Sequence, residues 1–297
     1  RIIDKNAIDV IHMHWGKDLP LAALGKVFSK RKPALIYTRQ MMITRAKDDF
    51  YHNFLYRQMD KLLTITRELE TLCKKFIPAA SDKITTLYYG VKPPEHFLSM
   101  EEITQQRESI GFSADDFVAG LIGRLEESKG QHLLIEAVHK AKQNGQPIKA
   151  LIVGHEMTPG YREELRTQAT ALGVIDNIVF QDFVTQPQML MQLCDCVILA
   201  SGQETFGLVL PEAMRAGVAV IGSNSGGVPE IIDHNETGLL FETKNSDSLY
   251  QQLQTLYLDS DFRDRLAENG RTKADKAFNN ETHFHTLENI FLETSDL

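Results

Sequence analysis

A short apolar run, residues 196–199, followed by a polar glycine-bearing loop and then a helical segment, constrains the fold of this chain most strongly. The run is short and carries β-branched side chains, which is typical of a buried strand. A helix is predicted to begin near Leu208, with Pro211 tolerated in its first turn. A strand, a loop and a helix in this order predict a helix N-terminus at the carboxyl edge of a parallel sheet, where α/β folds hold ligands.

Two carboxylates flank this predicted helix start. Glu204 lies in the loop, and Glu212 lies one turn into the helix. The backbone N–H groups of residues 206–209 have no acceptor within the helix, and together with the positive end of the helix dipole they suit a phosphate group. Carboxylates suit sugar hydroxyls. This one segment therefore has the chemistry to hold both halves of a nucleotide-sugar.

Apolar runs alternate with helical segments along the whole chain, which predicts parallel βαβ units and an α/β fold. Strands are expected at residues 8–12, 34–38, 62–66, 84–87, 117–122, 150–153, 178–181, 196–199 and 218–221. A glycine and two adjacent prolines interrupt the alternation within residues 88–97. We therefore predict a first domain over residues 1–92, a second over residues 93–278, and a final amphipathic helix within residues 279–297.

Composition excludes several classes of protein. A length of 297 residues suits two domains, and a net charge of −8 argues against nucleic acid as a partner. No apolar run approaches the roughly 18 residues of a membrane span, and residues 1–30 do not resemble a signal peptide. The three cysteines show no metal-binding spacing, so a reducing, cytoplasmic location is predicted.

The chain begins at Arg1, directly ahead of a strand that resembles one from the middle of a domain. We expect that an N-terminal part of the first domain is missing from this sequence. The first domain should then be smaller than the second, with exposed apolar surface near residues 8–12.

Two further loops follow predicted strands of the second domain. In the loop from Gly123 to Gly130, Arg124 and Lys129 lie at the carboxyl end of a strand. These two cations either clamp a diphosphate or belong to a solvated loop, and the loop lacks the Walker A pattern. The turn at residues 225–232 contains adjacent glycines, which permit either close approach to a ligand or simply a tight turn.

Taken in order, these three segments resemble the retaining glycosyltransferases of family 4, which have the GT-B architecture of two Rossmann-like domains with parallel sheets facing a cleft. The resemblance rests on the Gly-Arg-Leu…Lys-Gly loop at 123–130, the spacing of Glu204 and Glu212 around Phe206-Gly207, and the Gly-Gly-Val-Pro-Glu run at 226–230. It covers about residues 115–278.

The resemblance implies a role for each matched residue. Arg124 and Lys129 would contact the diphosphate of a nucleotide-sugar donor, Glu204 the hydroxyls of the transferred hexose, and Glu212 the ribose. Arg124, Lys129 and Glu204 are thus the candidate catalytic residues. The other donor-binding positions would be Gly123, Phe183, Val184, Phe206, Gly207, Leu208 and Val209, with Phe183 and Val184 beside the base. The final helix would pack back on the N-terminal domain.

The first half matches the family less well. His14 corresponds to a histidine often found after the first strand, although a hydrogen-bonded structural histidine explains it equally well. Gln40 stands where many members have a histidine near the transferred sugar. Because glutamine cannot carry a proton, that role is either absent here or filled by another group. His14 and Gln40 are the acceptor-side candidates.

The resemblance implies transfer of a hexose from a nucleoside diphosphate sugar to a hydroxyl of a saccharide or lipid-linked glycan, with retention of anomeric configuration. No metal or other cofactor is expected, because no Asp-x-Asp pair ends a strand of the second domain. Peripheral contact with the inner face of a membrane stays open. The alternatives are a GT-B sugar-nucleotide epimerase and a non-catalytic nucleotide-sugar-binding subunit.

Overall fold

The computed structural model describes residues 1–295, and the chain divides into two compact units. The first unit contains residues 1–90 and the chain from Phe278 onward, and the second contains residues 91–277. The boundary lies two residues before the predicted one because Arg215 Nη1 donates to the carbonyl oxygen of Val91 and so ties it to the second unit. Phe278 belongs to the first unit, where its ring packs edge-on against Tyr88 at 5.7 Å.

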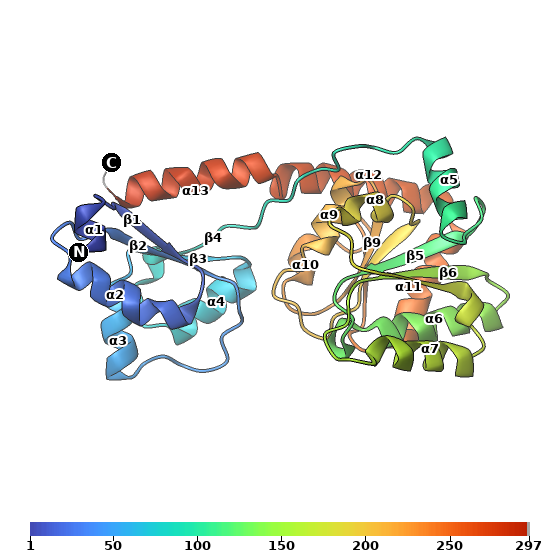
Figure 1. Cartoon of the computed structure of the whole chain (residues 1–297), viewed down its shortest axis with the longest axis horizontal. Coiled ribbons are helices and arrows are strands. Elements are labelled where there is room, and N and C mark those ends of the chain that lie inside the picture. Colours follow the sequence, from blue (N-terminus) through green and yellow to red (C-terminus); the bar gives the residue numbers. More distant parts are fainter. Residues whose placement is uncertain (296–297) are drawn as a thin grey trace. The chain divides into compact units, whose positions relative to one another are not determined.

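The first unit is built on a sheet of four parallel strands in the order β1-β2-β3-β4. Its strands are β1 (Val10–Met13), β2 (Ala34–Arg39), β3 (Lys61–Thr64) and β4 (Ile84–Thr86). Its helices are α1 (Ile2–Lys5), α2 (Leu19–Phe28), α3 (Phe50–Arg57), α4 (Arg67–Phe76) and α13 (Asn280–Thr294). Figure 1 shows α13 on one side of this sheet and α2, α3 and α4 on the other. β1 is an edge strand whose first three residues are only partly buried.

Helix α13 is fixed to the first unit by contacts with β1 and with the segment after β4. Asn279 caps its N-terminus through its side-chain oxygen. The ring of His283 bonds the carbonyl oxygen of Tyr88 at 2.7 Å, and the ring of Phe291 lies 5.0 Å from that of His12. Phe291 of this helix thus packs within the first unit, whereas Phe284 and Leu292 are exposed.

The second unit is built on a six-stranded parallel sheet in the order β10-β9-β8-β5-β6-β7. Its strands are β5 (Phe117–Ile122), β6 (Ile148–Val153), β7 (Ile178–Gln181), β8 (Cys196–Leu199), β9 (Ala219–Ser223) and β10 (Leu239–Phe241). Its helices are α5 (Met100–Ser109), α6 (Gln131–Gln143), α7 (Tyr161–Ala171), α8 (Pro187–Met191), α9 (Val209–Arg215), α10 (Val228–Ile231), α11 (Ser246–Leu258) and α12 (Ser260–Ala277). The prediction of an α/β fold with parallel sheets is confirmed.

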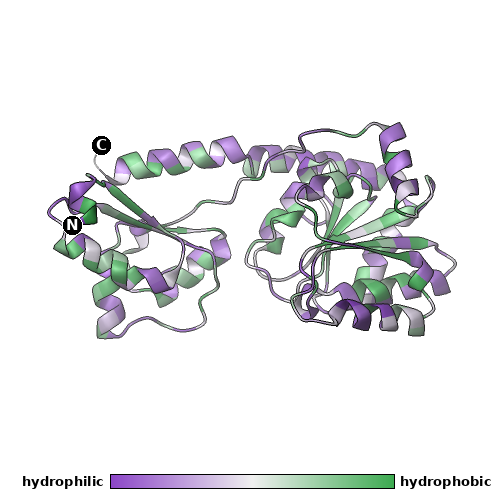
Figure 2. Cartoon of the chain, viewed as in Figure 1, coloured by the Kyte–Doolittle hydropathy of each residue, from purple (hydrophilic) through white to green (hydrophobic). Residues whose placement is uncertain are grey.

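The core of the second unit lies between the sheet and its helices. Helices α6, α7 and α11 cover one face, and α8, α9 and α12 cover the other (Figure 1). The strands are hydrophobic along their length, whereas the helices alternate between hydrophobic and hydrophilic residues (Figure 2). This is the pattern of a sheet buried on both faces. Among the described residues, no helix combines the length and apolar character needed to cross a membrane.

Strand β5 determines where a ligand site can form in the second unit. It pairs with β6 on one side and with β8 on the other. The loop after β5 and the loop after β8 are therefore neighbours at the carboxyl edge, although 75 residues separate Lys129 from Glu204. A reversal of strand order of this kind is where open α/β sheets bind ligands.

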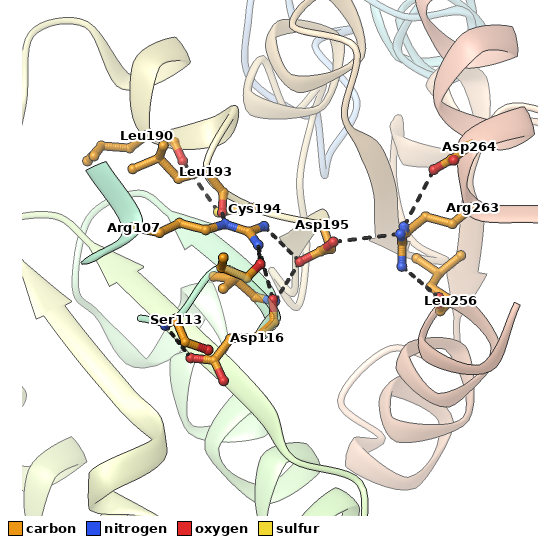
Figure 3. A network of polar contacts seen from close by, with 12 residues as sticks. Arg107, Ser113, Asp116, Leu190, Leu193, Cys194, Asp195, Leu256, Arg263 and Asp264 are labelled. Atoms are coloured by element: carbon orange, nitrogen blue, oxygen red, sulfur yellow. Dashed lines mark hydrogen bonds and ion pairs between the residues drawn. The ribbon is translucent and has the colours of Figure 1, made fainter. Parts of the chain in front are cut away.

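A buried ion network holds α5, β5, α12 and the start of β8 together (Figure 3). The Arg107 guanidinium donates to the carbonyl oxygens of Leu193, Ala114 and Asp116 and to the Asp195 carboxylate, at 2.9–3.1 Å. Asp195 also accepts from the backbone N–H of Val118 at 2.8 Å and lies 3.8 Å from Arg263. Because every polar group in this network has a partner, it fixes the register of these elements.

Replacement of Asp195 should therefore destabilise the second unit. Asp195→Ala leaves Arg107 buried without its counter-ion, which we expect to lower the free energy of unfolding by about 3 kcal/mol. Asp264→Ala is the matched control: it also faces Arg263, but its side chain is 76% exposed against 17% for Asp195. Urea unfolding followed by circular dichroism measures both. Equal effects of the two substitutions would contradict the role given to Asp195.

Candidate active site

The loop after β5 presents Arg124 and Lys129 at the carboxyl edge. Arg124 is half exposed and pairs with Glu126 at 3.0 Å. Its carbonyl oxygen accepts a hydrogen bond of 2.8 Å from Gln131 Nε2. Gln131 is the first residue of α6, and its side chain is fully buried. The buried amide therefore fixes the backbone at Arg124, and the ion pair with Glu126 orients its half-exposed guanidinium. Nothing in the sequence pattern distinguished Gln131 from the other polar residues of that helix.

The loop after β8 brings Glu204 to Lys129. Lys129 Nζ donates to Glu204 Oε2 at 2.7 Å, and Ser201 Oγ donates to the same oxygen at 3.2 Å. Both side chains of the pair are 21% exposed. The structure thus joins two of the three predicted catalytic residues in one partly buried ion pair at the point where strand order reverses.

Backbone contacts hold the two loops against each other. The N–H of Gly202 donates to the carbonyl oxygen of Ser128 at 3.1 Å. Gly130 has a φ of +75°, and a Cβ there would overlap the carbonyl oxygen of Ala200. Only glycine fits at this position, so the position of Lys129 depends on the backbone of the neighbouring loop.

The paired glycines before α10 pack against Glu204. The N–H of Gly227 donates to the carbonyl oxygen of Glu204 at 3.0 Å, and Ser225 Oγ donates to that of Gly202 at 3.1 Å. A Cβ on Gly226, whose φ is +57°, would overlap the Glu204 carbonyl oxygen. The sequence left open whether these glycines approach a ligand or form a tight turn. The structure shows that they support the Glu204 loop.

The predicted helix start is α9. Leu210 and Glu212 donate to the carbonyl oxygens of Gly207 and Leu208, which leaves the N–H groups of Gly207, Leu208 and Val209 outside the hydrogen bonds of the helix. The side chain of Phe206 is buried, whereas that of Leu208 is exposed.

Glu212 is mostly buried in the first turn of α9. Burial raises the pKa of its carboxyl group to about 7. Among residues 1–295, no donor lies within hydrogen-bonding distance of that carboxylate. It therefore has unused capacity to accept hydrogen bonds.

A largely apolar cavity of about 200 Å³ lies at the carboxyl ends of β5, β6 and β7. It is lined by Ile122, Gly123, Arg124, Val153, Gly154, His155, Phe183, Val184 and Pro187. The Phe183 side chain is 62% exposed, and its ring meets that of His155 edge-on at 5.8 Å. The structure brings four predicted donor-site residues, Gly123, Arg124, Phe183 and Val184, to one cavity. The sequence reasoning missed Gly154 and His155, although both directly follow a predicted strand.

The acceptor-side candidates lie in the first unit and touch each other. Gln40 Nε2 donates to His14 Nδ1 at 3.3 Å, which requires the His14 tautomer with its proton on Nε2. His12 packs beside His14 at 4.3 Å and bonds Thr38 Oγ1, and burial lowers the pKa of His12 to about 4. His14 and Gln40 both line a cavity of about 520 Å³.

Within the described residues, no group of three or more His, Cys, Asp or Glu side chains has the arrangement of a metal site.

Comparison with known proteins agrees with this geometry. Residues 102–273 match the model of a family described as glycosyl transferases group 1. The chain belongs to this family. The match includes the loops that carry Arg124, Lys129, Glu204 and Glu212.

Individual relatives extend the comparison beyond the second unit. An uncharacterized glycosyltransferase of Methanocaldococcus jannaschii is 34% identical over 216 residues, which are 71% of this chain and 54% of that protein. This chain thus spans about half the length of that relative. The capsular polysaccharide biosynthesis glycosyltransferase CapM of Staphylococcus aureus is 26% identical over 282 residues, 91% of this chain and 73% of CapM.

A solved structure supports the fold. HepE of Anabaena, determined in complex with UDP and glucose, superposes with a TM-score of 0.86 over 98% of this chain and 80% of HepE. At 24% identity this likeness shows the fold alone. The GT-B fold of two parallel-sheet Rossmann-like domains is thereby confirmed.

The packing of Gly226 predicts that a methyl group there displaces Glu204. Gly226→Ala should reduce glycosyl transfer by about 10²-fold, because the Glu204 loop must move. Gly145→Ala is the matched control, since Gly145 has a similar φ of +71° but open space around its Cβ position. Both variants carry the same backbone strain of about 1 kcal/mol. Turnover measured on both variants, after melting curves confirm folding, tests this. Equal activity losses would show that strain alone is responsible.

The raised pKa of Glu212 predicts a pH-dependent stability. Because the folded protein favours the protonated carboxyl, stability falls as pH rises from about 4.5 through about 7. The Gln side chain of Glu212→Gln cannot ionise. The free energy of unfolding of this variant, relative to that of the wild type, should therefore rise between pH 5 and pH 8 by up to about 3 kcal/mol. Melting curves at both pH values measure this, with Glu236→Gln, at an exposed side chain, as the control. A Glu212→Gln difference that does not change with pH would contradict the burial of Glu212.

Proposed function

We propose that this protein transfers a hexose from a nucleoside diphosphate sugar to an acceptor hydroxyl, with retention of anomeric configuration. The observation that carries the proposal is the Lys129–Glu204 pair, where a cation suited to a phosphate adjoins a carboxylate suited to sugar hydroxyls. The resemblance to the retaining enzymes of family 4 supports the stereochemistry.

The donor would lie along the carboxyl edge of the second unit's sheet. The cavity beside Phe183 and Val184 offers apolar surface for a base, and Arg124 lines the same cavity. The diphosphate would then reach Arg124, Lys129 and the N–H groups at the start of α9. Glu212, whose carboxylate has unused capacity to accept hydrogen bonds, suits the ribose hydroxyls. The UDP bound to HepE makes UDP-sugars the first donors to test.

The chemistry breaks the bond between the anomeric carbon and the diphosphate oxygen and forms a bond from that carbon to the acceptor oxygen. The acceptor hydroxyl gives its proton to the departing diphosphate oxygen or to solvent, and the nucleoside diphosphate leaves with the electron pair of the broken bond. Arg124, Lys129 and the N–H groups are preorganised to stabilise that charge, and each such group typically contributes about 3 kcal/mol. Glu204 holds Lys129 in place and accepts hydrogen bonds from the hexose.

The acceptor is proposed to be a saccharide or a lipid-linked glycan, and CapM, whose name places it in capsular polysaccharide biosynthesis, supports this class. A cytoplasmic location with peripheral contact at the membrane's inner face remains part of the proposal.

Incubation with radiolabelled UDP, GDP and ADP sugars tests the proposed activity. A transferase yields a labelled glycoside only when an acceptor is present. An epimerase converts the donor without an acceptor, and a binding subunit retains the donor and forms no product. A thermal-shift screen with the same nucleotides identifies the donor first, because a ligand that binds the folded state raises the melting temperature.

The clamp of Arg124 and Lys129 predicts transfer without a metal ion. Turnover should be unchanged in excess EDTA, and Lys129→Ala should lower kcat on the order of 10²-fold. Arg124→Lys should also be poor, because a point charge cannot replace the guanidinium fork. Lys276→Ala, at an exposed side chain of the same unit, serves as the control. Activity lost in EDTA and restored by Mg²⁺ or Mn²⁺ would overturn the clamp.

A further inference from the structure

The cavity of the first unit has a charge opposite to that of the whole chain. Four cations line it, Lys17, Arg39, Arg45 and Lys47, and no Asp or Glu is among its lining residues. The whole chain carries a net charge of −8. A cavity of about 520 Å³ is large enough for a small ligand. This concentration of positive charge therefore calls for a specific explanation.

Arg39, at the end of β2, has no carboxylate partner within the described residues. Its Nη2 donates to the carbonyl oxygen of Met42 at 3.2 Å, its Nη1 lies 3.5 Å from the Tyr37 hydroxyl, and its buried Nε has no acceptor. Burial raises the pKa of Tyr56 to about 12 and that of Tyr37 above its ordinary value, so neither phenol is a counter-ion at neutral pH. A half-buried cation without a counter-ion is costly, and a bound anion offsets that cost.

The other three cations are also free of ion pairs within residues 1–295. Lys17 lies over the Trp15 ring at 5.4 Å. Two nearby acids outside the lining are Asp48, next to Lys47, and Asp49, which caps α3 and hydrogen-bonds the His52 ring. Asp18 adds one negative charge near Tyr37. Four cations line the cavity, whereas these three acids lie outside its lining, so the lining itself is positive.

The same cavity contains the acceptor-side candidates and apolar surface. His14 and Gln40 line it, and so do the exposed side chains of Trp15 and Met41. An occupant would thus meet cations, aromatic and apolar surface, and the two residues expected near the reacting hydroxyl. A neutral saccharide would leave the four cations without a counter-ion.

We propose that this cavity binds a phosphate or diphosphate group on the acceptor, which is then a phosphorylated sugar. This inference rests on the proposed function. Arg39 provides a fork for phosphate oxygens, with Lys17, Arg45 and Lys47 as further cations. The phosphate belongs either to a soluble sugar phosphate or to a lipid-linked diphosphate sugar, and both sources present the same chemistry to the cavity.

Trp15 reports binding without requiring activity, because it is the only tryptophan in the chain and lines the cavity. The probes are glucose 6-phosphate and farnesyl diphosphate, with glucose and farnesol as their neutral counterparts. The titrations use full-length Lys129→Ala protein, so that the donor site does not compete for phosphate. A saturable change in Trp15 fluorescence with at least one phosphorylated probe, and with neither neutral one, is expected. A response to glucose 6-phosphate favours a soluble sugar phosphate as the acceptor. A response to farnesyl diphosphate alone favours a lipid-linked diphosphate sugar.

Charge variants decide whether the cavity cations are responsible. Arg45→Gln with Lys47→Gln should weaken binding at least about tenfold, whereas Arg39→Lys should weaken it less than Arg39→Gln. Lys5→Gln with Lys30→Gln removes the same charge from the first unit outside the cavity and should leave binding unchanged. Equal weakening by both double variants, or no response to either phosphorylated probe, would overturn the inference.

Failure of the transferase proposal and failure of the anion-site proposal give different results. If no glycoside forms but Trp15 still reports phosphate binding that depends on Arg45 and Lys47, the transferase proposal fails and the anion site stands. If transfer to a phosphorylated acceptor proceeds at the wild-type rate in the Arg45→Gln, Lys47→Gln variant, the function stands and the anion site is wrong. Melting curves of each variant exclude loss of folding as the cause.

Discussion

The position of β5 in the middle of the second unit's sheet determines most of what this protein presents at its candidate site. Because β5 pairs with both β6 and β8, the loops that follow β5 and β8 must lie side by side at the carboxyl edge. Lys129 meets Glu204 for this reason, and not because of any local sequence preference. The apolar cavity near Phe183 forms on the other side of β5, where β6 and β7 end.

Backbone contact between loops gives this edge its shape. Gly130 packs against the carbonyl oxygen of Ala200, and Gly226 packs against that of Glu204, so close in each case that a side chain would overlap. Hydrogen bonds from Gly202 and Gly227 join the same three loops. Glycines in loops at the carboxyl edge of a sheet are often interpreted as positions where the backbone comes close to a ligand. Here these two glycines bring one loop against another, and the proposed ligand contacts belong to the side chains of Arg124, Lys129 and Glu204.

The sequence predicted the elements better than their contacts. The strands at 117–122, 178–181 and 196–199 agree with β5, β7 and β8, because uninterrupted apolar runs mark strands buried on both faces. Strand β10 was missed because its three residues are too few for a periodic pattern. The packing of Gly226 against Glu204 could not be predicted from the sequence either, because it depends on β8 and β9 being neighbours in the sheet. Arg45 and Lys47 were not singled out, because isolated cations in a loop resemble solvated surface.

The two candidate sites differ in how their cations are balanced. In the second unit, Arg124 and Lys129 each pair with a carboxylate, whereas the four cations of the first unit's cavity pair with no carboxylate of residues 1–295. The side chains of Lys129 and Glu204 are each only 21% exposed, so this pair is screened less than a surface pair and holds Lys129 where a diphosphate would meet it. The carboxylate still limits the positions that Lys129 samples before a ligand arrives. Lys129 is therefore preorganised by a carboxylate. In the part of the first unit that the structure describes, Lys17 contacts the Trp15 ring, and Arg39 contacts Tyr37 and Met42. Selectivity at the first site must then come from the shape of the aromatic and apolar surface, because attraction alone does not distinguish one phosphate ester from another.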